Sequence, residues 1–500
     1  MSLKNTPLDL FEFVNRFRIL IIVNLILWAL IPGLSLGNLH VDTLEALYWF
    51  KEPAFGYWKH PPLTTWLLGL AHRPGPFGIV SLLGLSQILT ALTGYFIWRC
   101  VKRQADEKVA SLSVALFYLS TLASFYSLQI NHNSVLSPFI AATLCYGLEF
   151  LEGRSKRAMI GLGVAVGLGA LTKYEILFAL IPLFVLSLVI KRYRLVYRDA
   201  KAYGAIAIAA ILILPHVIWL IDNDFISIKR ATGSAPLAGW NAVLDGFSGI
   251  LWGCVVLYAT LFLALKAFHL KHTKIFTILK KDKTDREWIG IMLLFGAPLS
   301  VAVIGLLTGQ FIKALWLLPL VPSVTIGVAL LLAEAKFHFD LGTVAKRTTI
   351  GIVSLWILFW LYLFIGAFIQ KPHEAFFSNT KPLAKQVEML WAKHQSKPLA
   401  CVIINEVKLG GSPVLWLKDK PLFIEIPLRP WGTPDKQDHC NEMGAIAIEM
   451  DEGNAAQKLF PRLCEESAEK IEIKTLFGSK NDLWTGHIAY LPPKAESACP

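Results

Sequence analysis

Residues 17–34 read Phe-Arg-Ile-Leu-Ile-Ile-Val-Asn-Leu-Ile-Leu-Trp-Ala-Leu-Ile-Pro-Gly-Leu, an apolar run that is long enough to cross a membrane as a helix. Runs of roughly 17–25 apolar residues, the length that crosses the hydrocarbon core, recur along the first 370 positions. We predict eleven membrane spans, near residues 17–34, 78–98, 109–127, 134–151, 158–172, 175–190, 202–221, 248–266, 288–308, 313–333 and 349–370.

The composition excludes a single soluble globule. Of the 500 residues, 55% are hydrophobic and 16 are Trp, and the mean hydropathy is +0.52. Lys4, Arg16 and Arg18 precede the first span, and no small-residue cleavage pattern follows it. We therefore expect this span to be a membrane anchor and not a cleaved signal peptide.

The basic residues are divided unequally between the two sets of alternating loops. The set that includes the N-terminal segment carries 25 Lys and Arg residues, and the short loops of the other set carry seven. Because basic loops stay in the cytoplasm, we expect the N-terminus inside, with the 33–78 loop and everything after about residue 371 outside. The net charge of +12 then reflects topology, and without a nucleic-acid motif we expect no nucleic-acid partner.

The character of the chain changes after residue 370. Segment 371–500 is mixed polar and apolar, with helix-like stretches and short apolar runs that are typical of strands. We predict a transmembrane domain over 1–370 and a small soluble α/β domain over 371–500. The predicted helices lie near 381–395 and 453–463, and the predicted strands near 400–404, 421–426, 445–448 and 484–491.

Four of the seven cysteines lie in the predicted outer domain, where disulfides are permitted: Cys401, Cys440, Cys464 and Cys499. Four cysteines allow three pairings, and free buried thiols are an open alternative. The other three, Cys100, Cys145 and Cys254, lie in or beside membrane spans and are typical of packing positions.

The first outer loop places ionisable residues among aromatic ones. Asp42 and Glu45 are three residues apart, so on a short helix they share a face, where one can act as a base while the other tunes it. The run Gly56-Tyr-Trp-Lys-His-Pro-Pro62 combines aromatic anchors, the cations Lys59 and His60, and a stiff turn. Such residues at a membrane indicate a functional site. The alternative is an interfacial helix with snorkelling side chains.

Two later segments offer polar side chains on the same outer face. The second outer loop, Gln129–Ser134, is short and uncharged; amides such as that of Asn133 can hydrogen-bond a sugar or cap the next helix. Lys173 and Tyr174 interrupt an apolar stretch. An internal ion pair or snorkelling explains this lysine as well as a role in binding does.

Single cations also stand at the outer ends of later spans. Arg230 follows the span near 202–221, and Lys313 precedes the span near 313–333. Snorkelling explains any one of them. Several cations on one rim would suit a lipid phosphate.

The first outer loop also resembles a known motif. From Asp42 to Leu63 the chain has the form Asp-x-x-Glu-Ala…Gly-Tyr-x-Lys-His-Pro-Pro-Leu, which is similar to GT-C-fold glycosyltransferases of family 39. These enzymes, the protein mannosyltransferases and lipid A aminoarabinose transferases among them, use polyprenyl-phosphate sugars. Supporting matches follow in order at Ala170–Tyr174, Leu214–Trp219 and Lys313–Pro319. The resemblance covers roughly residues 20–370 and implies an all-α polytopic GT-C domain with about eleven transmembrane helices.

The chain departs from the family pattern at two places. Many relatives have adjacent Asp and Glu in the first loop, whereas Thr43 follows Asp42 here. Many also carry an acidic residue in the second outer loop, where this chain has Asn131, His132 and Asn133. These departures leave Asp42 nearly alone as the candidate base. No metal ligands are assigned and no cofactor is firmly expected, while a divalent cation stays an open alternative.

The resemblance implies a reaction and a location. A bacterial inner-membrane enzyme of this family would move a sugar, with inversion, from a polyprenyl phosphate carrier to a lipid acceptor on the periplasmic side, most simply a glycolipid resembling lipid A or lipopolysaccharide. Asp42 would be the catalytic base, with Glu45 as the second catalytic candidate. The candidate substrate-binding residues are Tyr57, Lys59, His60, Asn133, Lys173, Tyr174, Arg230 and Lys313. No nucleotide is needed, and the sequence has no Walker motif.

Two other classes of function stay open at this point. A chain of about eleven spans with ionisable residues at helix ends also suits a transporter or a lipid-carrier flippase, although the halves show no repeat. A paralogue that binds the carrier lipid without catalysis is the other alternative, since the second acidic residue is missing.

Overall fold

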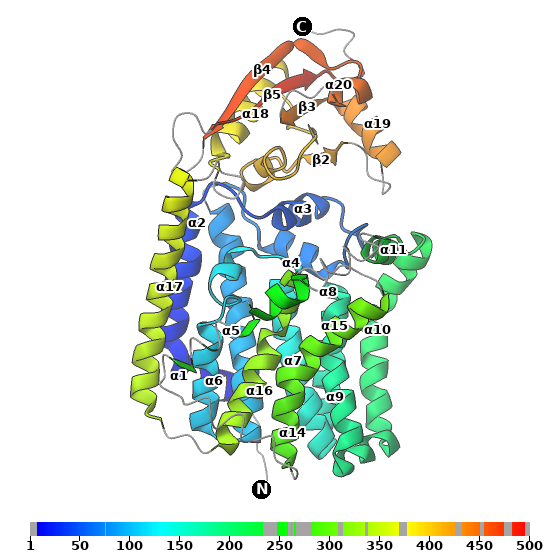
Figure 1. Ribbon diagram of the computed structural model, residues 1–500. Helices are drawn as coiled ribbons and strands as arrows, with labels where there is room; N and C mark the ends of the chain where they lie inside the picture. The colour runs from blue at the N-terminus through cyan, green and yellow to red at the C-terminus, as the bar shows by residue number, and fades with distance from the viewer. Residues whose placement is uncertain are drawn as a thin grey trace.

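A computed structural model describes residues 8–75, 77–233, 248–255, 257–258, 262, 265–266, 283–308, 314–335, 339–369, 378–426, 433–450, 455–474 and 483–495. Figure 1 shows a bundle of long helices with a sheet at one end, beyond the helix α3. The helix α1 begins at the end of the bundle that is far from this sheet.

The bundle is built almost entirely of helices. In chain order these are α1 (Leu8–Leu25), η1 (Ile26–Leu30), α2 (Ile31–Ser35), α3 (Val41–Trp49), α4 (Leu63–Ala71), α5 (Gly78–Gln104), α6 (Glu107–Tyr118), η2 (Phe125–Leu128), α7 (His132–Gly153), α8 (Lys156–Thr172), η3 (Tyr174–Ile176), α9 (Leu177–Val189), η4 (Lys191–Arg198), α10 (Ala200–Asp222), α11 (Ile226–Gly233), α14 (Asp285–Ile291), η5 (Met292–Gly296), α15 (Ala297–Thr308), η6 (Ala314–Leu320), α16 (Val321–Glu334) and α17 (Leu341–Ile369).

The structure confirms the predicted fold class, an all-α membrane domain with a small C-terminal sheet. Within the described residues, seven helices are long and apolar enough to cross a membrane: Asp9–Ser35, Gly78–Gln104, His132–Gly153, Ala200–Asp222, Asp285–Gly305, Leu315–Glu334 and Leu341–Ile365. A pair bent by 108°, Tyr174–Val189 and Lys191–Arg198, can form an eighth span. The predicted span near 158–172 is the 17-residue helix α8, and the one near 248–266 is described only in part, over 248–255, 257–258, 262 and 265–266.

The span predicted near 109–127 is too long. The helix α6 ends at Tyr118, and the chain then runs through turns and η2 toward α7. Hydroxyl groups in this stretch bond to the main chain: the Ser124 hydroxyl donates to the Ser120 carbonyl, and the Ser127 hydroxyl to the Ser124 carbonyl. Such side-chain bonds compete with a regular helix, which explains the early end of α6.

The C-terminal sheet has five strands in the order β2-β1-β3-β5-β4. The strands β2, β1 and β3 are parallel to one another. The strand β5 pairs antiparallel with β3, and β4 pairs antiparallel with β5. Along the chain, these elements are α18 (Lys381–His394), β1 (Cys401–Ile404), η8 (Ser412–Leu415), β2 (Leu422–Glu425), α19 (Thr433–Met443), β3 (Ala445–Met450), α20 (Ala455–Leu459), β4 (Cys464–Lys474) and β5 (Leu483–Leu491). The four predicted strands are present, whereas β4 and α19 were not predicted from the sequence. The domain boundary near 370 stays a prediction.

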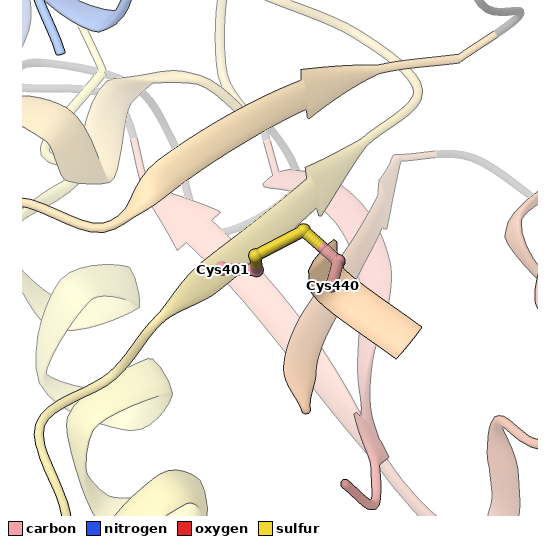
Figure 2. The surroundings of a disulfide bond; sticks show 2 residues. All are labelled: Cys401 and Cys440. Carbon is pink, nitrogen blue, oxygen red and sulfur yellow. A yellow bond between two sulfur atoms is a disulfide. The ribbon is translucent and has the colours of Figure 1, made fainter. Parts of the chain in front are cut away.

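A disulfide joins the sheet to the helix that packs on it. Cys401 in β1 is bonded to Cys440 in α19, across 39 residues of chain (Figure 2). This selects one pairing among those that the sequence left open, and Cys499 lies outside the described residues. Cys100 and Cys145 are free and buried, in accord with packing positions.

The sheet shares a hydrophobic core with the first outer loop. Leu44 and Tyr57 of that loop belong to the same buried cluster as Val402, Phe423 and Ile448 of the sheet. The Tyr48 ring of α3 stacks on Phe423 with centroids 6.1 Å apart, and the Tyr48 hydroxyl donates to Glu425 (3.4 Å). The sheet therefore covers the helix that carries the candidate catalytic carboxylates.

Candidate active site

A cavity of about 570 Å³ opens beside α3, where the outer ends of several helices meet. Seven of the predicted site residues line it: Asp42, Lys59, His60, Asn133, Lys173, Tyr174 and Arg230. Several separate segments of the chain contribute to its wall. The predicted outer-face residues thus converge on one site, although they are spread from Asp42 to Arg230 along the sequence.

Asp42 and Glu45 share one lysine, as expected for two carboxylates on the same face of a helix. Lys59 Nζ lies 3.3 Å from Asp42 Oδ1 and 2.6 Å from Glu45 Oε2. The Asp42 side chain is 26% exposed and lines the cavity, whereas that of Glu45 is 8% exposed and is absent from the cavity wall. Of the two catalytic candidates, only Asp42 can meet a substrate in this arrangement. Glu45 as a second catalytic group stays a prediction, with its side chain placed behind Asp42 and Lys59 and away from the cavity wall.

The charges of this trio stabilise one another. Burial would raise the pKa of the Asp42 carboxyl, but Lys59, followed by His40, outweighs it, so this pKa lies below its ordinary value. Burial dominates at Glu45, where the pKa is raised in spite of Lys59. Burial would lower the pKa of Lys59, but Glu45 and Asp42 raise it. At neutral pH the cavity therefore holds an ionised Asp42 beside a charged lysine.

His40 is a contact of Asp42 that was not predicted from the sequence. It is the N-cap of α3, and its Nδ1 accepts a hydrogen bond from the Asp42 amide (3.3 Å). The same nitrogen is 3.6 Å from Asp42 Oδ2. The sequence signal for His40 is its position: it lies two residues before the candidate base Asp42, at the N-terminus of a helix, where capping residues occur.

The second outer loop approaches Asp42 from the other side. Asn131 caps α7, donates to Asp42 Oδ2 at 3.5 Å and donates to the Tyr126 hydroxyl at 3.1 Å. Asn133 also donates to the Tyr126 hydroxyl (2.8 Å), and its own oxygen accepts from Lys173 (2.9 Å). The cap is thus Asn131 and not Asn133. Of these two amides, that of Asn131 donates to Asp42, and that of Asn133 connects Tyr126 to Lys173.

Lys173 forms the internal ion pair that the sequence offered as one explanation, and it also lines the cavity. It forms an ion pair with Glu175 at 2.6 Å, and it lines the cavity 5.8 Å from the centre of the Trp316 ring. Glu175 and Trp316 also line the cavity. The charge of Lys173 is therefore largely balanced before any ligand enters.

His60 neither contacts Asp42 nor simply packs on Pro61. Its ring stacks on His132, with centroids 3.7 Å apart. Burial, followed by the nearby His132 and Lys59, lowers the pKa of His60 well below its ordinary value, so the ring is neutral at neutral pH. His60 is thus a neutral wall of the cavity and not a phosphate-binding cation.

The other predicted binding residues differ in whether they line the cavity. Arg230, on α11, lines the cavity with its guanidinium 5.2 Å from the centre of the Trp58 ring. Tyr57 is fully buried; its ring stacks on Trp49 and it does not line the cavity, so its assignment as a substrate contact is not supported. Lys313 lies outside the described residues.

The cavity wall combines apolar and polar side chains. The apolar ones come from α9, α15 and η6: Leu177, Phe178, Val301, Ile304 and Leu315. The polar ones include Asp42, Lys59 and the asparagines. Within the described residues, no group of three His, Cys, Asp or Glu side chains is arranged to hold a metal ion. The cavity thus suits a ligand with a polar head and an apolar tail.

The chain is similar to known glycosyltransferases. Residues 59–219 match the family model described as dolichyl-phosphate-mannose-protein mannosyltransferase. The lipopolysaccharide core galacturonosyltransferase RgtA of Rhizobium johnstonii is 24% identical over 81% of this chain and 80% of its own length. The undecaprenyl phosphate-α-4-amino-4-deoxy-L-arabinose arabinosyl transferase of Serratia proteamaculans is 32% identical, over 38% of this chain and 34% of its own length.

A solved structure has the same fold across the whole chain. The crystal structure of ArnT from Cupriavidus metallidurans bound to undecaprenyl phosphate aligns with a TM-score of 0.64, at 12% sequence identity. The alignment covers 97% of this chain and 99% of ArnT. The apo structure of the same protein gives the same values.

Proposed function

We infer that this chain is a GT-C-fold glycosyltransferase, related to the lipid A aminoarabinose transferases, that moves a sugar from a polyprenyl phosphate carrier to an envelope glycolipid. The observation that carries this inference is the cavity, whose wall brings an ionised carboxylate and cations together with the apolar side chains of α9, α15 and η6. RgtA is named for transfer to the lipopolysaccharide core and ArnT was solved with undecaprenyl phosphate. The identity of the sugar is left to experiment.

The apolar and the polar side chains of the cavity wall suit the two parts of such a donor. The prenyl chain would lie among the apolar side chains of α9 and α15, and the sugar phosphate would lie toward Asp42. Arg230 is the cation best suited to the phosphate, since it has no acidic partner among the residues that the structure describes. Lys59 would be the second cation, shared with the carboxylates of α3.

The proposed reaction is a single displacement with inversion. The acceptor hydroxyl oxygen forms a bond to the anomeric carbon, the bond from that carbon to the phosphate oxygen breaks, and the electron pair leaves with the lipid phosphate. The hydroxyl proton passes to Asp42 Oδ2, the carboxylate oxygen that is not bonded to Lys59. Lys59 and Arg230 stabilise the phosphate that is released. A phosphate leaving group is already an anion and needs charge stabilisation more than protonation.

The multi-pass membrane architecture is clear, and we propose its orientation. The sheet lies at one end of the bundle, next to α3, whose Asp42 lines the cavity, and the disulfide in the sheet fits an oxidising compartment such as the periplasm. The short loops assigned to this side carry seven Lys and Arg residues, against 25 in the other set. We therefore propose that the N-terminus is cytoplasmic and that the sheet and cavity face the periplasm of a bacterial inner membrane.

Reporter fusions test this orientation. A reporter placed after Arg286, at the end of the bundle far from the sheet, should read cytoplasmic. One placed after Thr380, just before α18, should read periplasmic. If both fusions report the same side, the cavity and the N-terminus do not lie on opposite sides of the membrane. The proposed periplasmic reaction is then wrong as well.

Removing the charge of Arg230 tests the proposed donor. Arg230→Gln should raise the Kd for polyprenyl phosphate by about 10–100-fold, the cost of roughly one to two charge-assisted hydrogen bonds. Lys229→Gln is the matched control, because it removes the same charge from the adjacent residue, which does not line the cavity. The measurement is lipid binding by native mass spectrometry of the purified protein. If both variants lose the same affinity for polyprenyl phosphate, the two cations act only through the total positive charge of this segment. If neither variant loses affinity, Arg230 is not part of the donor site.

A further inference from the structure

The motif Leu214–Trp219 lies near the end of α10, and none of its residues lines the cavity. His216 is 1% exposed and does not line the cavity, yet both of its ring nitrogens have partners. Nδ1 is 2.7 Å from the Phe55 carbonyl oxygen, and Nε2 is 2.9 Å from the Tyr174 hydroxyl. One buried side chain of α10 thus joins the loop that carries Lys59 to a residue of the cavity wall.

The direction of these hydrogen bonds follows from their chemistry. A carbonyl oxygen can only accept, so Nδ1 of the neutral His216 carries the proton and donates to Phe55. Nε2 must then accept from the Tyr174 hydroxyl. The Tyr174 oxygen can in turn accept from the Ser227 hydroxyl, which is 3.0 Å away and belongs to a residue that is 1% exposed. The chain of bonds therefore runs from Ser227 through Tyr174 and His216 to the Phe55 carbonyl.

The next residue of the loop also lies directly on α10. A Cβ atom added at Gly56 would lie 2.1 Å from Cε3 of Trp219, so only glycine allows this close approach. Trp219 is stacked parallel to His216, with ring centroids 6.0 Å apart. The main chain at residues 55 and 56 is therefore fixed against α10 by one hydrogen bond and one close packing contact.

This attachment comes just before the residues that hold the donor site. Trp58, three residues after Phe55, lies under the Arg230 guanidinium, and Lys59 bonds the carboxylates of α3. Arg230 is on α11, one turn after Ser227. The hydrogen-bond chain thus reaches the two segments that carry the cations of the cavity. One is α11 with Arg230, and the other is the loop with Lys59, which is shared between two carboxylates.

We propose that His216 is a positioning residue that holds Lys59 and Arg230 at the spacing that binds the lipid phosphate of the donor. This inference rests on the proposed function, because it assigns the two cations to that phosphate. His216 acts through Phe55 and Tyr174 and touches no substrate. Its loss should weaken carrier binding and leave the chemistry at Asp42 largely intact.

Three variants separate the two bonds of His216. His216→Asn places its amide nitrogen where Nδ1 was, so it keeps the bond to Phe55 and loses that to Tyr174. His216→Gln reaches toward Tyr174 and loses Phe55. We expect His216→Gln and Gly56→Ala to raise the Kd for polyprenyl phosphate and the donor KM by about tenfold, while kcat changes by less than about threefold. His216→Asn loses the bond to Tyr174 but leaves the Tyr174–Ser227 bond and the attachment of the Lys59 loop in place, so we expect a smaller rise in Kd and KM, of about threefold, with kcat unchanged.

The measurements are carrier binding, the KM and kcat of transfer, and the melting temperature of each purified variant. His394→Gln, in the C-terminal domain, is the control for the loss of a stacked histidine. If the Asn and Gln variants have the same carrier affinity, or if His216→Gln lowers only the melting temperature, His216 is a packing residue and the proposal is overturned. A wild-type chain that does not bind polyprenyl phosphate would instead contradict the proposed function, and the inference with it.

Discussion

Replacing Asp42 by Asn is expected to lower kcat for sugar transfer by about 10²–10⁴-fold, the range that a general base contributes. The substitution keeps the size of the side chain and its ability to accept a hydrogen bond from Lys59, but it removes the proton acceptor. Expression and binding of polyprenyl phosphate should stay close to wild type, because Asp42 meets the acceptor and not the phosphate. The measurement is transfer at saturating donor.

Glu45→Gln is the matched control for this prediction. It removes a carboxylate from the same helix and the same lysine, but at a position that does not line the cavity. We expect it to lower kcat far less than Asp42→Asn does. If Asp42→Asn keeps most of the activity while Glu45→Gln abolishes it, the roles are exchanged. If both variants stay active, the base lies elsewhere.

Replacing Lys59 by Met is expected to abolish transfer and to destabilise the protein. Glu45 would lose its 2.6 Å partner while it remains 8% exposed. Protonating an ordinary carboxyl at pH 7 costs about 3 kcal/mol, which sets the scale of the lost stability. The variant also removes the main interaction that lowers the pKa of Asp42. That pKa should rise, so any residual activity should be lost at higher pH on acidification than in wild type.

The double variant Lys59→Met with Glu45→Gln separates the two effects. A neutral amide needs no buried cation, so the melting temperature should return toward that of wild type. Activity should not return, because the cation at the cavity wall is still missing. If the double variant regains transfer, Lys59 serves only to neutralise Glu45 and has no part in donor binding.

The sequence predicts those site residues that belong to one local motif, but it does not predict contacts that form only in the tertiary fold. The Asp42–Leu63 motif is local, so the residue pattern alone predicts both carboxylates and Lys59. The burial of Tyr57 was not predicted, because the same aromatic signal marks a ring that faces a ligand and a ring that stacks inside a core, here on Trp49. The pairing of His60 with His132 was missed because it joins two loops that only the tertiary fold brings together.

The fold shows the same division. Long apolar runs predicted the spans, since length and hydropathy are properties of a single segment. The early end of α6 was missed because serine hydroxyls bond to the main chain there, in a stretch that is otherwise apolar. The strand β4 was missed because its sequence, Cys-Glu-Glu-Ser-Ala-Glu-Lys-Ile-Glu-Ile-Lys, is mostly polar, as suits the edge of a sheet.

The most direct test of the proposed function is a transfer assay with purified protein in lipid vesicles that contain a lipid A acceptor. The donor is polyprenyl phosphate carrying galacturonate or 4-amino-4-deoxy-arabinose, and it is compared with the nucleotide-linked form of the same sugar. The products are identified by mass spectrometry. We predict that at least one lipid-linked donor glycosylates the acceptor, that the nucleotide donors give no product, and that Asp42→Asn removes the reaction. Equal transfer from a nucleotide sugar would contradict the proposed function.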